Sequence, residues 1–384
     1  MTAVLVQPFG LLSPGGGPKI LRSLLLPGDG VLSICTAAKP PPKGGPYEEM
    51  HLPAVQALSL LADTRLAAWR EVRLRHVQRR LLTGLLAATD GMALGAVHGL
   101  GHSPDFHAAR MLAAERGCPF ILSVHDDIRY ALAGHPWRRR VDRQFADAWK
   151  SAQQRFVISD ALGAEYEQRY GRRPWSVITD GAEGAPTASP GPSNTVHFMG
   201  AAHLSYEPNF TSLLDALELG NHGAPSDRPT RLVCRGSSPE PLQGHALLET
   251  RPWTSDDVVQ EELRSAGVLY LPLPFARSDQ PLTRFSLPTK MISYLAAGRP
   301  VLYHGPAHSP AGQLLTEFAA GVCVTSLHPR AVAAGLDAAR QSAPALAVGA
   351  RRLLHERFDL RSLQARFRDA LGLVPHGSEL GSST

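Results

Sequence analysis

Short apolar segments alternate with amphipathic segments along most of the chain. Short apolar, β-branched runs predict buried strands, whereas longer segments with a 3.6-residue period predict helices. Their regular alternation indicates an α/β fold, with parallel sheets covered by helices on both faces. The predicted strands are residues 3–9, 31–37, 92–98, 120–124, 155–159, 176–179, 196–199, 231–234, 268–273, 301–303 and 322–324. The predicted helices include residues 104–116, 161–170, 209–219, 256–265, 288–297, 310–319 and 360–371.

A break in this pattern divides the chain into two halves. Residues 184–194 contain three prolines and no large apolar side chain, which is typical of a linker. We therefore predict an N-terminal α/β domain over residues 1–183 and a C-terminal one over residues 195–358. A helix over residues 359–373 follows, and we expect the polar residues 374–384 to be disordered.

Length and composition agree with two folded domains. With 384 residues, 43% of them hydrophobic, the chain can bury two cores, which excludes a disordered protein. Its four cysteines are far apart and form no Cys-x-x-Cys pair, so we expect a reducing compartment and no structural zinc. No apolar run is long enough to span a membrane, and the apolar N-terminus fits a strand better than a signal peptide. These features predict a cytoplasmic protein.

The net charge of +5 is concentrated in the first half of the chain. Residues 1–185 hold 22 basic and 17 acidic residues, whereas residues 186–384 hold 17 of each. Six arginines lie within residues 65–80, and three more at 138–140 follow Trp137. This excess fits an anionic acceptor or peripheral contact with a membrane surface, and a solvated helix face is the alternative. It is too small to indicate nucleic-acid binding, which we do not expect.

The segment between Arg284 and Pro300 contains the most informative pattern. Pro288 suits the first position of a helix, and Gly298 suits its end. The free N–H groups and the dipole at such a start favour an anion, and Lys290 adds a full positive charge there. Arg284 lies just upstream and can add a second charge. The pattern predicts a diphosphate site, with a well-capped structural helix and a solvated lysine as the alternative.

A second candidate follows the predicted strand 120–124, where His125, Asp126 and Asp127 come directly after the apolar run. Polar residues at the carboxyl ends of parallel strands face the ligand crevice in this architecture. Histidine can move a proton or bond a sugar hydroxyl near neutral pH, and either aspartate can orient the imidazole or accept a proton. The alternative is a group of polar residues that caps the next helix.

A glycine-rich loop follows the first predicted strand. Gly15, Gly16 and Gly17 let the backbone approach a phosphate or a sugar closely, and a simple turn is the alternative. The spacing is not Gly-x-Gly-x-x-Gly, so the dinucleotide fingerprint is absent. His98 and His102 are four residues apart, but the glycines around them prevent a helix that would hold both on one face. We therefore expect no zinc site there.

The residues from Ser286 to Pro306 resemble the donor-site segment of GT-B glycosyltransferases of family four. In that family, a helix with the pattern Pro-x-Lys, followed by Tyr-Leu-Ala-Ala-Gly-x-Pro-Val, begins at the nucleotide-sugar pocket. More loosely, residues 155–159, 177–181 and 198–209 resemble other parts of the same family in the same order.

The resemblance implies two Rossmann-like domains that face each other across a cleft, with the last helix packed back on the first domain. It implies a retaining transfer of a hexose from a nucleotide-diphospho-sugar to a glycan, lipid-linked or small-molecule acceptor. The nucleotide sugar is a co-substrate, and neither a metal nor a further cofactor is expected. The implied catalytic residues are His125, Asp126 and Asp127. The implied donor-binding residues are Gly16, Gly17, Arg284, Ser286, Thr289, Lys290 and Ser293.

The chain departs from the family pattern at two positions. Family members carry glutamates where this chain has Phe285 and Ser293. The first glutamate contacts the sugar and the second often binds the donor ribose, so these contacts must come from elsewhere. Donor preference and stereochemical outcome stay open, as does a catalytically silent GT-B protein that binds a glycan or another partner. A nicotinamide oxidoreductase would also fit two α/β domains, but it lacks its glycine fingerprint here.

Overall fold

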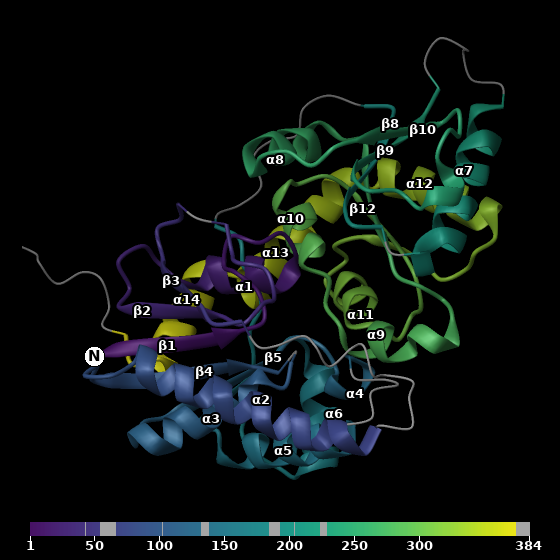
Figure 1. Cartoon of the computed structure of the whole chain (residues 1–384). Helices are drawn as coiled ribbons and strands as arrows, with labels where there is room; N and C mark the ends of the chain where they lie inside the picture. Colours follow the sequence, from purple (N-terminus) through teal and green to yellow (C-terminus); the bar gives the residue numbers. More distant parts are fainter. Residues whose placement is uncertain are drawn as a thin grey trace, which may run out of the picture. The chain divides into compact units, whose positions relative to one another are not determined.

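The computed structural model describes residues 1–42, 44–53, 67–101, 103–131, 138–183, 193–202, 204–222 and 229–373 (Figure 1). The chain forms two compact units. Unit 1 comprises Met1–Asp180 and the segment that starts at Leu360, and unit 2 comprises Gly181–Asp359. Most of the predicted linker and the whole predicted polar tail lie outside the described residues, as do His102 and Trp137.

Unit 1 is built on a seven-stranded parallel sheet with the order β3-β2-β1-β4-β5-β6-β7. The strands are β1 (Thr2–Gln7), β2 (Val31–Cys35), β3 (Glu48–His51), β4 (Leu94–Leu100), β5 (Phe120–Val124), β6 (Gln154–Val157) and β7 (Ser176–Val177). Every residue of β2 and β5 is buried, as expected for strands with helices on both faces. The edge strand β3 was not predicted, because its sequence Glu-Glu-Met-His is polar and half exposed.

Helices cover both faces of this sheet. They are α1 (Gly16–Leu24), α2 (Ala67–Ala88), α3 (Asp105–Arg116), α4 (Ile128–Ala131), α5 (Arg138–Ser151), α6 (Asp160–Tyr170) and α14 (Leu360–Ala370). In Figure 1, α2, α3 and α5 lie on one side of the sheet, whereas α1 and α14 lie together on the other.

The helix α14 closes the core of unit 1, although it comes last in the described chain. Arg368 forms an ion pair of 2.8 Å with the buried carboxylate of Asp29. The fully buried ring of Phe367 packs edge-on against His98, with 5.4 Å between the ring centroids. Burial lowers the pKa of His98 to about 3, and its Nε2 lies 2.7 Å from Oγ of Ser123, so this histidine is a neutral core residue.

Unit 2 contains a six-stranded parallel sheet with the order β10-β9-β8-β11-β12-β13. The strands are β8 (Thr195–Gly200), β9 (Arg231–Gly236), β10 (Leu248–Arg251), β11 (Val268–Pro272), β12 (Val301–His304) and β13 (Val322–Val324). The helices are α7 (Glu207–Asn221), α8 (Asp256–Ser265), α9 (Gln280–Phe285), α10 (Thr289–Ala296), α11 (Pro310–Glu317), α12 (Pro329–Gln341) and α13 (Ala343–Arg357).

Aromatic residues form the centre of the unit 2 core, beneath the packed helices α7 and α12. The rings of Phe198 and Tyr270 meet the ring of Phe210 edge-on, at centroid distances of 5.0 and 5.6 Å. The Tyr270 hydroxyl lies 2.7 Å from Nδ1 of His304, whose pKa burial lowers to about 4. His304 is therefore neutral near pH 7 and serves the core.

Both sheets have the strand order of doubly wound α/β folds. The order reverses between β1 and β4 in unit 1 and between β8 and β11 in unit 2. This arrangement confirms the predicted α/β fold class. Ligands of such sheets bind outside the carboxyl ends of the strands that flank the reversal, so these ends locate a candidate site in each unit.

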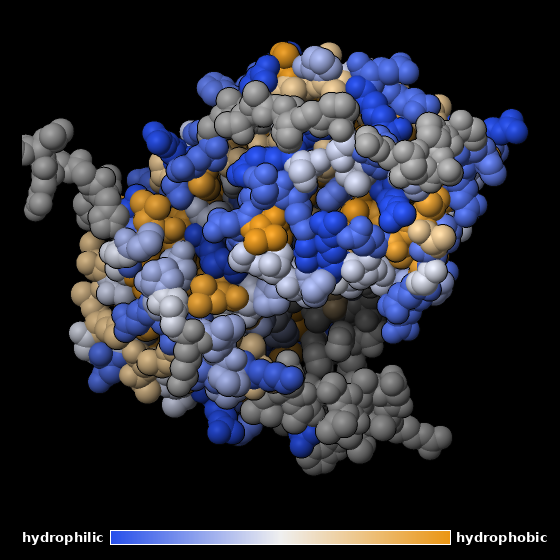
Figure 2. Space-filling model, turned by 90° about the horizontal axis from the view of Figure 1, so that it is seen from above, coloured by the Kyte–Doolittle hydropathy of each residue, from blue (hydrophilic) through white to orange (hydrophobic). Residues whose placement is uncertain are grey.

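The face of the molecule in Figure 2 is mostly hydrophilic, and its hydrophobic residues form small separate groups. Scattered groups of this kind are normal on folded proteins and do not by themselves mark an interface. Within the described part of the chain, no helix combines the length and the hydrophobicity that crossing a membrane requires.

Candidate functional site

Two glycines end the neighbouring strands β8 and β9, on one side of the reversal point of unit 2. Gly200 at the end of β8 and Gly236 at the end of β9 both have a φ of +113°, which side-chain-bearing residues rarely adopt. A methyl group on Gly236 would lie only 2.7 Å from the carbonyl oxygen of Gly200. The two strand ends can therefore approach each other this closely only with glycine at position 236.

Lys290 reaches the same strand ends from the first turn of α10. A methyl group on Gly200 would lie 3.5 Å from its Nζ. Nζ also lies 4.2 Å from the centre of the Phe198 ring and 5.7 Å from that of Tyr206, in the geometry of cation–π contacts. Burial of the ammonium lowers the pKa of Lys290 to about 7. Among the described residues, no carboxylate forms an ion pair with it.

The helix α10 begins one residue later than predicted. Pro288 keeps an extended backbone, with φ −66° and ψ 121°, and Thr289 is the first helical residue. Proline fits here because the first residues of a helix need no N–H partner within it. The N–H groups of the first turn and the side chain of Lys290 thus belong to one helix start, which is suited to an anion.

The other predicted donor residues surround this helix start in different ways. Arg284 is exposed, and its guanidinium carbon lies 5.0 Å from the centre of the Phe285 ring. The backbone N–H of Ser286 donates to the carbonyl of Leu282 at 3.0 Å and ends α9. Ser293 is only 6% exposed and Phe285 only 3%, so both positions that carry glutamate in family four are buried.

An exposed tryptophan that the sequence did not predict as a site residue lies beside Gly236. Trp253, 58% exposed, follows β10, and a methyl group on Gly236 would lie 3.0 Å from its Cζ2. The loops after β8 and β9 are joined, because the N–H of Ala202 donates to Oγ of Ser237 at 3.0 Å. An exposed aromatic ring of this kind can stack on a planar group of a ligand. No sequence pattern indicated Trp253, because β10 was not predicted and the residue belongs to no recognised motif.

In unit 1, the three residues that follow β5, His125, Asp126 and Asp127, have different surroundings. His125 is only 5% exposed, and Asp126 is partly exposed. Asp127 is buried, and its two carboxylate oxygens accept hydrogen bonds from Arg169 at 2.6 and 3.1 Å. It also accepts from the backbone N–H of Arg129 in α4 at 3.2 Å. The carboxylate of Asp127 is thus engaged as a structural ion pair and helix cap, as in the alternative interpretation of this segment.

The glycine-rich loop forms the start of α1. Gly15 has a φ of +122° and precedes the helix, and Gly16 and Gly17 are its first two residues. Lys19 in the first turn forms an ion pair of 3.0 Å with Asp180, whose side chain is 1% exposed. Burial raises the pKa of Asp180, and Lys19 opposes this shift. Asp180 lies within residues 177–181, which resemble a part of family four, but the sequence pattern assigned it no role.

A cavity of about 350 Å³ lies over the carboxyl ends of β1 and β2. Its walls combine Leu11, Leu12 and three prolines with the polar side chains of Tyr47, Glu49 and His51. Glu49 is held in place, since it accepts hydrogen bonds from the N–H of Leu11 at 2.9 Å and from a serine hydroxyl at 2.7 Å. A cavity with apolar walls and a few fixed polar groups suits a small polar ligand such as a sugar. Among the described residues, no group of three or more potential metal ligands comes together.

Comparisons with known proteins identify the fold. No protein-family model and no curated protein sequence matches the chain. Solved structures of GT-B glycosyltransferases do match over nearly the whole length. Anabaena Alr3699/HepE in complex with UDP is 14% identical, with a TM-score of 0.62 over 97% of this chain and 100% of that chain.

Two further matches are sugar-phosphate synthases. Sucrose-phosphate synthase from Thermosynechococcus elongatus is 12% identical, with a TM-score of 0.66 over 96% of this chain and 97% of that chain. The α,α-trehalose 6-phosphate synthase from Burkholderia multivorans is 13% identical, with a TM-score of 0.65 over 97% and 98%. At these identities the similarity establishes the fold: the chain is an α/β protein of the GT-B type with two Rossmann-like domains.

Proposed function

We propose that this protein is a cytoplasmic glycosyltransferase, resembling family four, that moves a sugar from a nucleotide-diphospho-sugar to an acceptor. The observation that carries the proposal is the convergence of Lys290, the start of α10 and the glycine ends of β8 and β9. The similar structures include HepE with UDP and with UDP and glucose, which supports a nucleotide sugar as donor. Sucrose-phosphate synthase and α,α-trehalose 6-phosphate synthase have the same fold as this chain.

The donor diphosphate binds at the start of α10 in this proposal. Lys290 supplies a charge there, and the N–H groups of the first turn and the Thr289 hydroxyl supply hydrogen bonds. Arg284 and Ser286, just upstream, contact the diphosphate from the side. Gly200 lets the phosphate oxygens approach the backbone of β8. A diphosphate next to Nζ of Lys290 favours the ammonium form and restores the charge that burial suppresses.

The nucleobase stacks on Trp253. Trp253 is exposed and lies beside Gly236, and Lys290 lies beside the neighbouring Gly200, so we expect one nucleotide to contact both side chains. Stacking on an aromatic side chain contributes about 1–3 kcal/mol per base in proteins that bind single-stranded nucleic acids. Uracil is the base to test first, because the related structures contain or form UDP. With Phe285 and Ser293 buried, binding depends on the diphosphate and the base rather than on carboxylates.

In this proposal, unit 1 binds the acceptor and contributes the side chain that acts on the transferred sugar. His125 follows β5 at the carboxyl edge of the sheet and bonds the sugar or moves a proton, with Asp126 beside it. Gly16 and Gly17, which the family resemblance assigns to donor binding, open the helix α1 of this unit. A glycan, lipid-linked or small-molecule acceptor binds in the cavity with Glu49 and His51. We expect retention at the anomeric carbon, since a similar trehalose-6-phosphate synthase was studied for glycosyltransfer with retention.

A catalytically silent GT-B protein is the second candidate, and the buried Phe285 and Ser293 favour it. Calorimetry with a panel of nucleotide sugars and free nucleotides separates the two candidates and identifies the base. A transferase binds one nucleotide sugar and releases the nucleotide diphosphate when an acceptor is added. A protein that binds none of the panel contradicts the proposed function.

A further inference from the structure

The turn after β5 that carries His125 is anchored at both ends. The carbonyl of Val124, the last residue of β5, accepts a hydrogen bond of 3.1 Å from the N–H of Ile158. The carbonyl of Asp127 accepts one of 2.9 Å from the N–H of Ala131 and thereby opens α4. Only two residues, His125 and the one after it, lie between these anchors. The position of Asp127 therefore constrains the direction of the His125 side chain.

Two side chains of α6 hold the second anchor in place. The guanidinium of Arg169 donates to both carboxylate oxygens of Asp127, at 2.6 and 3.1 Å. The hydroxyl of Tyr166 accepts a hydrogen bond of 3.0 Å from the backbone N–H of Ile128 and lies 3.4 Å from Oδ1 of Asp127. Residues three apart lie on the same face of a helix, so α6 presents both groups to the turn together. One helix thus fixes both the side chain and the backbone at the end of the turn.

The hydroxyl of Tyr166 has a fixed place because three other aromatic rings pack against its ring. The fully buried ring meets those of Phe145, Trp149 and Tyr170 edge-on, at centroid distances of 5.2, 5.5 and 5.3 Å. Burial of the phenol, with Asp127 beside it, raises the pKa of Tyr166, so the hydroxyl keeps its proton near pH 7. A phenylalanine at this position keeps the packing of the ring and removes only the hydroxyl.

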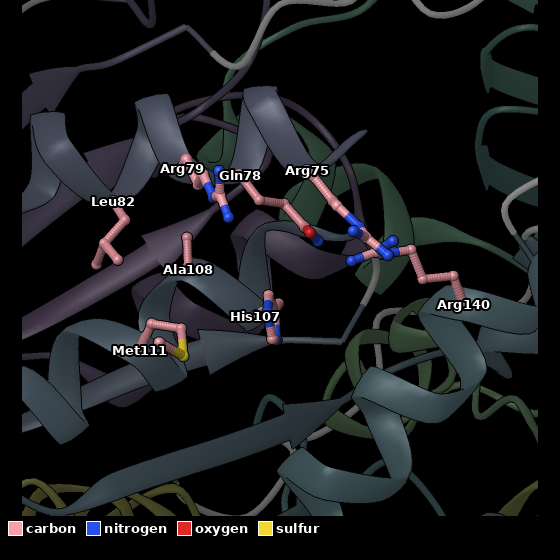
Figure 3. A pocket seen from close by; sticks show the side chains of 8 residues that line it. All are labelled: Arg75, Gln78, Arg79, Leu82, His107, Ala108, Met111 and Arg140. Carbon is pink, nitrogen blue, oxygen red and sulfur yellow. The ribbon is translucent and has the colours of Figure 1, made fainter. Parts of the chain in front are cut away.

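The helices behind α6 are tied to one another by hydrogen bonds. Gln78 of α2, one of the side chains in Figure 3, exchanges hydrogen bonds of 3.0 and 2.9 Å with Gln144 of α5. The hydroxyl of Tyr170 in α6 donates to Asp142 of α5 at 2.7 Å. The helix α6 is thus joined to α5, and α5 is joined to α2. Functional side chains are held more precisely by packed elements of this kind than by loops alone.

We propose that Tyr166 and Arg169 are positioning residues for His125. This role rests on the function proposed for His125 above. Neither side chain touches the sugar or the acceptor; both act through Asp127 and Ile128, which set the course of the turn. A displacement of about 1 Å can cost an enzyme about 100-fold in rate, so a looser turn slows transfer without changing how the donor binds in unit 2.

The variants Tyr166→Phe and Arg169→Lys test this role. The first removes the hydroxyl that the N–H of Ile128 uses, and the second keeps the charge but loses the planar fork that holds two carboxylate oxygens. Tyr170→Phe is the matched control, because it removes a buried hydroxyl from the same helix whose partner is Asp142 of α5. Circular dichroism and thermal unfolding establish that each variant is folded.

We expect Tyr166→Phe and Arg169→Lys each to lower kcat by about tenfold, with KM for the nucleotide sugar unchanged and with Tyr170→Phe equal to the wild type. In a His125→Ala background, Tyr166→Phe should lower kcat no further, because the side chain that it positions is gone. Wild-type kcat in both variants overturns the proposal. An equal loss of kcat from Tyr166→Phe with and without His125 overturns it as well.

A spectroscopic measurement separates this proposal from the proposed transferase activity. NMR of protein labelled at histidine follows the imidazole of His125, whose signals are assigned by their loss in His125→Ala. We expect these signals to shift in Tyr166→Phe and in Arg169→Lys but not in Tyr170→Phe. Unchanged His125 signals in the first two variants overturn the proposal even where the wild type transfers sugar. If the wild type transfers none, the proposed function fails, and the signals still test whether α6 positions His125.

Discussion

The charge state of Lys290 links its burial to the proposed chemistry. In the free protein, burial lowers its pKa to about 7, so above this pH the native side chain is mostly neutral. A bound diphosphate raises the pKa, and binding above pH 7 therefore takes up a proton. We expect the affinity for UDP to fall as pH rises above about 7, by at most tenfold per pH unit. Calorimetry at pH 8 in buffers of different ionisation enthalpy measures the uptake, and its absence would contradict this assignment.

Asp126 and Asp127 are neighbours in sequence, but their surroundings predict different roles. Asp127 is buried in an ion pair with Arg169, and removing one partner of such a pair typically costs about 3–5 kcal/mol. Asp127→Asn is therefore expected to lower the free energy of unfolding by a few kcal/mol. Asp126→Asn, at a partly exposed side chain, is the matched control and is expected to leave stability nearly unchanged. Denaturant unfolding measures both, and equal stability of the two variants would argue against the structural role of Asp127.

At the level of the element, the ends of β8 and β9 depend on glycine. Gly236→Ala places a methyl group 2.7 Å from the carbonyl oxygen of Gly200, at a φ of +113°, and should cost at least about 1–3 kcal/mol of stability. Gly220 in α7 provides the opposite case, because a methyl group there meets nothing within 4 Å. Gly220→Ala should stabilise the protein by roughly 0.5–1 kcal/mol. Thermal unfolding measures the stability of both variants. If Gly236→Ala is as stable as the wild type, the close approach of Gly200 and Gly236 is contradicted.

Sequence periodicity predicted most strands because they are short, apolar and buried. It missed β3 and β10, which are polar, partly exposed and lie at the edges of their sheets. The position of Lys290 in a first helical turn was predictable from the residues around it. Its contact with Phe198 was not, since that residue lies on a strand far away in sequence. The pairing of Asp127 with Arg169 and the exposed Trp253 likewise depend on tertiary structure that local patterns do not encode.

At the level of the whole molecule, the chain returns to unit 1 after completing unit 2. The fully buried ring of Phe367 in α14 contacts His98 and Phe156 of the unit 1 sheet, with 5.4 and 5.8 Å between ring centroids. Truncating a buried phenylalanine to alanine typically costs about 3–5 kcal/mol. We expect Phe367→Ala to speed hydrogen exchange of core amides in unit 1 and to leave those in unit 2 unchanged. Faster exchange confined to unit 2 would contradict the assignment of α14 to unit 1.

In the whole molecule, we expect unit 2 to bind the diphosphate of a nucleotide sugar through Lys290. Calorimetric titration of UDP into the wild-type protein, Lys290→Ala and Lys150→Ala tests this role of Lys290. Lys150 is exposed on α5, so its variant removes the same charge away from the site. Loss of a charge-assisted contact of about 1.5–3 kcal/mol predicts that Lys290→Ala weakens UDP binding by roughly 10- to 100-fold, whereas Lys150→Ala binds as the wild type does. Equal affinities of Lys290→Ala and the wild type for UDP would show that Lys290 does not bind the diphosphate.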